Sequence, residues 1–177
     1  MNRAVFLDRD GVINKVVLRD GRPYPPPSLK AFEFLPGAVD AISRLHSAGL
    51  LIIVVTNQPD VRTGVQKQEV MEAIHDRISE ACTIDDIIVC NHVDEDHCSC
   101  RKPKEGMLLT AARRWCIGLG DSFLIGDRWR DIAAGKAVGC RTYLIDYGYA
   151  EKQADSPDSV VTSLSEASNL IVEYLRA

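Results

Sequence analysis

Two carboxylates, Asp8 and Asp10, directly follow the short apolar run 4–7 and precede Gly11. Alternate residues of an extended chain point the same way, so this spacing places both carboxylates on one side of the backbone. One of them could attack an electrophile while the other carries protons. Asp-x-Asp-Gly also occurs in plain turns and in calcium loops, although a helix-loop-helix calcium site would need a helix where the strand-like run 4–7 stands.

A hydroxyl and an amide, those of Thr56 and Asn57, follow a second apolar run at 51–55. At the end of a strand these groups can donate hydrogen bonds to a phosphate. An ordinary strand-end turn is the alternative, because Thr and Asn are common there.

A second pair of acids, Asp127 and Asp131, follows the strand-like run 122–125. Gly126 permits a tight turn, and a spacing of four residues places both carboxylates on one face of the next helix. Oxygen ligands suit a hard cation such as Mg²⁺. We expect Asp127 to be a ligand; Asp131 is a further candidate that could instead only complement the helix dipole.

Three thiols and one imidazole lie within eleven residues, at Cys90, His92, Cys98 and Cys100. This set matches a tetrahedral Cys₃His zinc site, and four protein ligands would make that site structural. His97 is a rival ligand, but it adjoins Cys98 and breaks the paired spacing. A disulfide or a chance cluster is the alternative, and an expected cytoplasmic location favours metal.

Two cations, Arg101 and Lys102, follow the last thiol directly. Held in place by the loop, Lys102 could offset the charge of a phosphoryl group and Arg101 could bind a second anion. Lys104 is the rival of Lys102, and a solvated surface position is the alternative for the pair.

The elements that must position these residues alternate between strand and helix. Apolar runs predict strands at 4–7, 51–55, 87–89, 122–125 and 142–145, and helical periodicity appears at 39–48, 70–81, 107–112, 130–138 and 164–175. Such alternation predicts an α/β fold with an open parallel sheet covered on both faces. Ligands bind at the carboxyl ends of such strands, where Asp8, Thr56, Asn57 and Asp127 all fall.

Composition narrows the class of protein. With 177 residues and 46% hydrophobic content, we expect a single domain over 1–177, with a flap at 16–35 and a zinc loop at 90–102. A net charge of −4 gives no sign of a nucleic-acid partner. The longest apolar stretch, 50–55, is too short to cross a membrane, and no signal peptide is recognised. We therefore expect a cytoplasmic protein, and a monomer.

The four motifs together resemble those of the haloacid dehalogenase (HAD) phosphatase superfamily. Asp8–Val12 is similar to its first motif, Thr56–Gln58 to its second, Lys102 to its third, and Gly126-Asp127 with Asp131 to its fourth. The cysteine-rich loop narrows the resemblance to a branch that holds phosphatases of D-glycero-D-manno-heptose 1,7-bisphosphate and of histidinol phosphate.

The resemblance implies a Rossmann-like, three-layer fold and a phosphomonoesterase mechanism. Asp8 would form an aspartyl-phosphate, and Asp10 would act as acid and base. Mg²⁺ would be held by Asp8, the backbone carbonyl of Asp10, and Asp127. Thr56 and Lys102 would steady the phosphoryl group. Substrate contacts would come from Asn57, Gln58, Arg101 and Arg128.

Spacing and local likeness bear on the substrate. Only 45 residues separate Asp10 from Thr56, and 45 separate Thr56 from Lys102, which leaves no room for a large cap domain. Segments 32–41 and 101–109 resemble the heptose enzyme, whereas the short cysteine loop resembles the histidinol-phosphate branch. We expect hydrolysis of a small phosphorylated sugar, the 7-phosphate of the heptose bisphosphate, with histidinol phosphate as the alternative substrate. A zinc-stabilised interaction module with a relic site is the non-enzymatic alternative.

Overall fold

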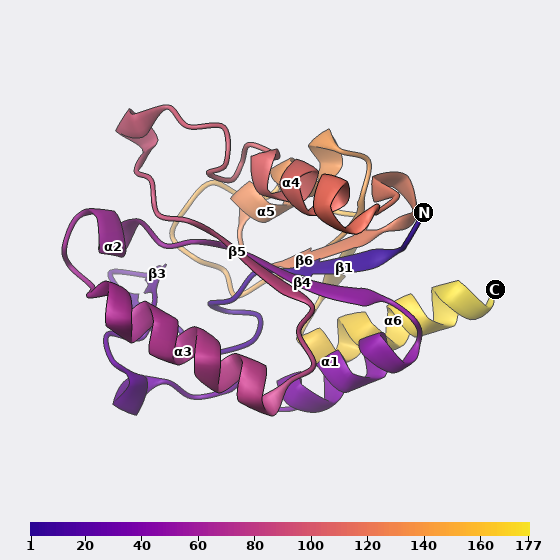
Figure 1. The fold of residues 1–177 in the computed structure, drawn as a ribbon, viewed down its shortest axis with the longest axis horizontal. Coiled ribbons are helices and arrows are strands. Elements are labelled where there is room, and N and C mark those ends of the chain that lie inside the picture. Colours follow the sequence, from indigo (N-terminus) through magenta and orange to yellow (C-terminus); the bar gives the residue numbers. More distant parts are fainter.

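Six parallel strands cross the centre of the molecule in the order β5-β4-β1-β6-β7-β8 (Figure 1). The computed structural model describes residues 1–177. The strands are β1 (Ala4–Leu7), β4 (Leu51–Asn57), β5 (Asp86–Cys90), β6 (Phe123–Gly126), β7 (Arg141–Ile145) and β8 (Ser159–Val161).

Helices cover both faces of this sheet (Figure 1). One face packs against α1 (Ala38–Ser47), α3 (Gln68–Ala81) and α6 (Leu164–Arg176). The other packs against α4 (Gly106–Trp115) and α5 (Trp129–Ala137). Alternate residues of β1 belong to different cores, with Val5 and Leu7 in the first and Ala4 and Phe6 in the second. The predicted three-layer α/β fold is confirmed.

The central position of β1 explains where the polar residues gather. It pairs with β4 on one side and β6 on the other, so the chain order reverses between β1 and β6. Ligand crevices in open α/β sheets lie at such a reversal, beyond the carboxyl ends of the strands. Asp8 and Asp127 follow directly on these two strands, and the backbone N–H of Asp8 donates to the Ile125 carbonyl at 3.0 Å.

The region 16–35 contains more regular structure than its prolines indicate. A β-hairpin forms from β2 (Val17–Arg19) and β3 (Arg22–Tyr24), and a 3₁₀ turn follows at Leu29–Ala31. Its two-residue turn, Asp20-Gly21, takes φ values of 50° and 72°, as the primed turns of tight hairpins require. Pro23 is tolerated because β3 pairs with β2 alone.

Three further short helical elements lie outside the expected pattern. They are α2 (Pro59–Arg62) and the 3₁₀ turns Asp94–Asp96 and Leu119–Asp121. None of the helices has the length and apolar character needed to cross a bilayer.

Candidate active site

A fully buried lysine lies between two carboxylates at the carboxyl end of β1. The Nζ atom of Lys102 is 3.0 Å from Asp8 Oδ1 and 2.5 Å from Asp131 Oδ1, and it donates to the Val55 carbonyl at 2.8 Å. Burial alone would lower the pKa of Lys102, but Asp131 and Asp8 outweigh burial and hold that pKa above its ordinary value. Burial also raises the pKa of Asp8, to about 6, although Lys102 acts against the rise. The lysine is therefore a fixed positive charge.

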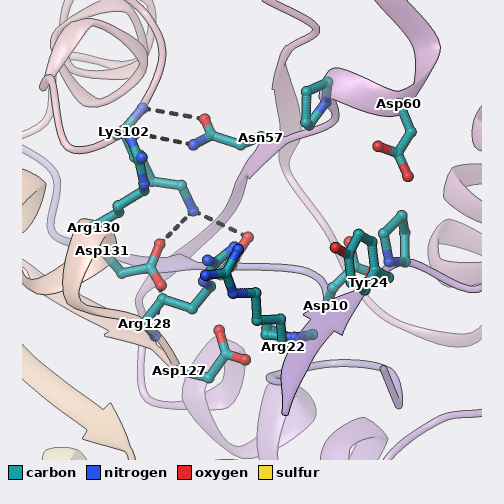
Figure 2. Close-up of a pocket in the computed structure, with 14 residues that line it drawn as sticks. Asp10, Arg22, Tyr24, Asn57, Asp60, Lys102, Asp127, Arg128, Arg130 and Asp131 are labelled. Atoms are coloured by element: carbon teal, nitrogen blue, oxygen red, sulfur yellow. Dashed lines mark hydrogen bonds and ion pairs between the residues drawn. The ribbon is translucent and has the colours of Figure 1, made fainter. Parts of the chain in front are cut away.

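One side chain from β4 holds the backbone of Lys102 at two points, and Arg130 Nη1 also donates to the Lys102 carbonyl at 3.3 Å. Asn57 donates from Nδ2 to the Lys102 carbonyl and accepts from the Lys102 N–H, both at 3.1 Å (Figure 2). This two-point attachment joins the loop that carries the lysine to the strand end beside Asp8. Asn57 thus positions Lys102 and also lines the pocket.

Asp127 presents a buried oxygen with no hydrogen-bond partner. Its Oδ2 accepts from the Tyr149 hydroxyl at 2.8 Å, whereas its buried Oδ1 has none. Burial raises the pKa of Asp127 well above its ordinary value, and the charges of Asp8 and Asp131 add to the rise. Oxygens of these three carboxylates lie within 4.8 Å of one another. An orphaned buried oxygen within an all-oxygen set fits a hard divalent cation such as Mg²⁺.

Two glycines allow these acids to approach one another. A Cβ on Gly11, whose φ is +82°, would lie 1.9 Å from Asp127 Oδ2. A Cβ on Gly126 would lie 2.2 Å from that of Asp131. The glycine of the Asp-x-Asp-Gly segment is thus required by the backbone conformation and by the close approach of Asp127.

Asp10 is held by a buried polar network. Arg9, at 0% exposure, forms an ion pair with it at 2.9 Å, and Asn14 and Gln58 donate to it at 2.9 and 2.7 Å. Gln58 also donates to the Thr56 hydroxyl at 2.8 Å and accepts from Arg9 at 3.0 Å. Sequence reasoning missed Arg9 and Asn14, because an Arg between two acids is ordinarily a surface residue.

The network ends at a histidine of α3. Arg9 Nη1 lies 3.1 Å from His75 Nε2, and because an arginine can only donate, the neutral imidazole accepts. Burial, reinforced by the Arg9 charge, lowers the pKa of His75 to about 4.

A pocket of about 240 Å³ opens above these groups (Figure 2). Seven residues predicted from sequence line it: Asp8, Asp10, Asn57, Lys102, Asp127, Arg128 and Asp131. Seven other residues also line it and were not selected by sequence reasoning: Arg22, Pro23, Tyr24, Pro25, Pro59, Asp60 and Arg130. Three predicted residues are absent from its lining: Thr56, Gln58 and Arg101.

Three arginines near the site are ion-paired with acidic residues. Arg128 is ion-paired with Glu151, and its Nε lies 3.0 Å from both carboxylate oxygens. Asp94 forms ion pairs with Arg130, at 3.1 Å, and with Arg101, at 2.7 Å. Arg101 is therefore drawn to the cysteine-rich loop, while Arg130 remains at the pocket wall.

The four predicted zinc ligands converge. The Cys98 sulfur lies 3.7 Å from that of Cys90 and 3.5 Å from that of Cys100, and His92 Nδ1 lies 3.2 Å from the Cys100 sulfur. The third sulfur–sulfur distance, between Cys90 and Cys100, is 2.9 Å, shorter than the roughly 3.8 Å that Zn–S bonds of about 2.3 Å give in a tetrahedral site. All four donor atoms lie within 4.8 Å of one another, close enough to hold one ion. His97 is not among these ligands.

Lys104, the alternative to Lys102, is hydrogen-bonded to the cysteine-rich loop. Lys104 Nζ donates to the carbonyls of Cys98 and His97, at 2.6 and 3.3 Å. Lys104 does not line the active-site pocket, whereas Lys102 does.

The chain is similar to proteins of known activity along most of its length. Residues 99–167 match the HAD-hydrolase-like family model. The D-glycero-beta-D-manno-heptose-1,7-bisphosphate 7-phosphatase of Pseudomonas putida is 36% identical over 155 residues, which are 85% of this chain and 86% of that protein. The protein of the same name from Pasteurella multocida is 32% identical, with 97% of each covered.

Solved structures agree with this relationship. The D,D-heptose 1,7-bisphosphate phosphatase of B. bronchiseptica, crystallised with magnesium and phosphate, has a TM-score of 0.80 and 28% identity, and covers 97% of this chain and 99% of its own. A putative HAD-like phosphatase from Mesorhizobium loti has a TM-score of 0.79 and 28% identity, over 98% of this chain and 87% of its own. The chain therefore belongs to the HAD-like phosphatases, phosphomonoester hydrolases, in the family of the heptose 1,7-bisphosphate 7-phosphatases.

Proposed function

We propose that this enzyme is a Mg²⁺-dependent phosphatase that removes the 7-phosphate of D-glycero-D-manno-heptose 1,7-bisphosphate. The relatives that carry this activity in their names align with most of the chain. The observation that carries the proposal is the cluster of Asp8, Lys102 and Asp127 at the point where the strand order reverses. A relic of an active site would have no need to keep all three.

The hydrogen bonds of Asp8 favour Oδ2 as its attacking oxygen. Oδ1 accepts from the Arg9 N–H at 2.8 Å and faces Lys102, while no hydrogen bond within the chain occupies Oδ2. In the proposed reaction Oδ2 bonds to phosphorus as the phosphorus–oxygen bond to the sugar breaks, and Lys102 offsets the charge on the phosphoryl oxygens. Asp10 gives a proton to the departing alkoxide.

The second half of the reaction returns the enzyme to its starting state. Asp10 takes a proton from a water molecule, whose oxygen bonds to phosphorus as the bond to Asp8 Oδ2 breaks. Inorganic phosphate leaves with Asp8 again a carboxylate. Arg9, Asn14 and Gln58 hold the Asp10 side chain at the site, so we assign them positioning roles. We assign Thr56, bonded to Gln58, to the same support.

Asp8, Asp127 and the backbone carbonyl of Asp10 would hold Mg²⁺. When bound, the cation would supply positive charge that offsets the negative charge of the phosphoryl group. Tyr149 orients Asp127 for this role through its hydrogen bond to Oδ2. We assign Asp131 to a different task, because its Oδ1 contacts Lys102 and its Oδ2 accepts from the Arg128 N–H at 3.0 Å.

Zn²⁺ at Cys90, His92, Cys98 and Cys100 would be structural. It would fix the loop that leads into Lys102 and leave no open position for chemistry. Reduced thiols at this site accord with a cytoplasmic enzyme. We further propose that the chain acts as one domain and as a monomer, with a small phosphorylated sugar as its partner and neither nucleic acid nor membrane.

A substrate panel tests the proposal. Phosphate release would be measured with Mg²⁺ from the heptose bisphosphate, from other sugar phosphates and from histidinol phosphate, with Asp8→Asn as the inactive control. We expect the highest kcat/KM with the heptose bisphosphate and no turnover by the variant. Fast hydrolysis of histidinol phosphate with none of the bisphosphate would reject the substrate. No activity above the variant on any phosphomonoester would reject the enzyme.

A further inference from the structure

The hairpin residue Arg22 is the one lining cation that has no carboxylate partner. No carboxylate oxygen lies within 4.0 Å of its guanidinium. The other lining cations are each ion-paired: Lys102 with Asp8 and Asp131, Arg128 with Glu151, and Arg130 with Asp94.

Contacts from distant parts of the chain hold the hairpin at the pocket. The Ala150 N–H donates to the Gly21 carbonyl at 2.9 Å, at the tip of the hairpin. The buried Gln66 side chain donates to the Pro26 carbonyl at 2.8 Å, just beyond its second strand. Figure 2 shows the Arg22 side chain extending from this hairpin toward the centre of the pocket. Its position is thus set by the fold, although the side chain itself is exposed.

The hairpin places a second arginine beside the first. Arg19 and Arg22 are direct partners in the antiparallel register, which puts both side chains on one face. Like charges opposite one another are unfavourable in a sheet. Arg19 lies over the Tyr24 ring at 5.1 Å, and Arg22 makes no such contact. An anion at Arg22 would relieve this repulsion.

We propose that Arg22 binds the phosphate group that is not cleaved, and so selects a sugar bisphosphate over a monophosphate. This inference rests on the function proposed above. Lys102, together with the Mg²⁺ that the carboxylates would hold, offsets the charge of the phosphate that reacts. The second phosphate is also a dianion and needs another cation. An arginine can bind it through two parallel hydrogen bonds.

The pocket has room for a ligand much larger than a water molecule. Its volume, about 240 Å³, far exceeds the ~10–15 Å³ that one water needs by this measure. Asp10 and Asp60 also line the pocket. Their negative charge disfavours a second phosphate beside them, so a second phosphate is better placed at Arg22.

The test is the ratio of kcat/KM for the heptose 1,7-bisphosphate to that for the heptose 7-phosphate. Arg22→Gln is expected to lower this ratio about 10- to 100-fold, as loss of a charged hydrogen bond does. Arg22→Lys keeps the charge without the planar fork and should restore part of the ratio. Arg62→Gln is the matched control, because Arg62 is also an exposed arginine but does not line the pocket. It should leave the ratio within about twofold.

Two kinetic outcomes would overturn the inference. If Arg22→Gln slows both substrates equally, Arg22 serves the reacting phosphate or the fold. If it changes neither, Arg22 is a surface residue.

Binding to the Asp8→Asn protein separates this inference from the proposed function. If wild-type enzyme hydrolyses neither sugar phosphate, the proposed function fails, and calorimetry on Asp8→Asn decides the role of Arg22. Tighter binding of the bisphosphate that disappears with Arg22→Gln supports the inference. Equal binding of the two ligands, or none, overturns it.

Discussion

The ammonium of Lys102 lies 2.5 Å from the carboxylate of Asp131, and each side chain is only 2% exposed. Asp131 also accepts the backbone N–H of Arg128 at the start of α5. The carboxylate thus joins the first turn of a helix to the lysine that faces Asp8. A buried pair of this kind is costly to break from one side, because the remaining charge loses its partner.

Asp131→Asn is therefore expected to impair both folding and catalysis. Removing one member of a buried ion pair costs about 3–5 kcal/mol of unfolding free energy. A displaced Lys102 should lower kcat about 100-fold, the usual size for one lost electrostatic contact in a transition state. Urea unfolding and steady-state kinetics check the two effects.

The matched control for this variant is Glu80→Gln. Glu80 pairs with Arg77 at 3.8 Å on the exposed surface of α3. Its loss should change stability by no more than about 0.5 kcal/mol and leave kcat intact. Equal effects of the two variants would show that Asp131 is an ordinary surface partner.

A methyl group on Gly11 should lower the metal-dependent activity about 100-fold. It would overlap Asp127 Oδ2 at 1.9 Å and displace a proposed Mg²⁺ ligand. Misplacement of a catalytic group by about 1 Å costs on the order of 100-fold in rate.

Gly49→Ala separates this clash from backbone strain, because Gly49 has a similar φ of +84° and nothing within 4 Å of its Cβ position. It should lose about 1–2 kcal/mol of stability but keep its kcat. Full activity in Gly11→Ala would refute the assigned geometry.

The stability of the protein should depend on pH through His75. Its folded pKa, about 4, lies below the value near 6.5 of an unfolded histidine. Between these values the unfolded state binds more protons, so His75 costs stability as pH falls from about 6.5 to 4. His75→Gln, which can still accept from Arg9, should remove this part of the slope. Urea unfolding across that range measures it, with the exposed His46→Gln as control. An unchanged slope in His75→Gln would contradict the assignment.

The cysteine loop should depend on zinc. We expect about one equivalent of zinc in the purified protein by elemental analysis. Cys100→Ser should retain less than about half an equivalent and unfold about 5–10 °C lower, because metal binding contributes directly to folding. Cys116 is exposed and lies outside the cluster, so Cys116→Ser should match the wild type in both measurements. Unchanged stability and zinc content in Cys100→Ser would exclude the site.

Most of the fold follows from the sequence because its patterns are strong and local. The runs that became β1, β4 and β6 are apolar and end in polar residues, so both the strands and the sheet edge that they share could be predicted. The convergence of the four proposed zinc ligands could be predicted equally well, since their spacing alone brings two short arms together. The hairpin at 17–24 could not be predicted, because its prolines obscure a turn that depends on Asp20 and Gly21.

Ion pairs and hydrogen bonds between residues far apart in the sequence could not be predicted from it. Arg101 and Arg128 could be identified as cations near the site, but nothing local indicates that Asp94 and Glu151 hold them. Gln58 belongs to a motif that suggested substrate contact, yet its own side chain is fully buried. Such assignments depend on which side chains the sheet and its loops bring together.

The most direct test of the account is ³¹P NMR of the heptose 1,7-bisphosphate during turnover with Mg²⁺. The account predicts that the 7-phosphate resonance decays into inorganic phosphate while the 1-phosphate resonance persists. The reaction should vanish in Asp8→Asn. Loss of the 1-phosphate, no release of either group, or undiminished turnover by Asp8→Asn would contradict it.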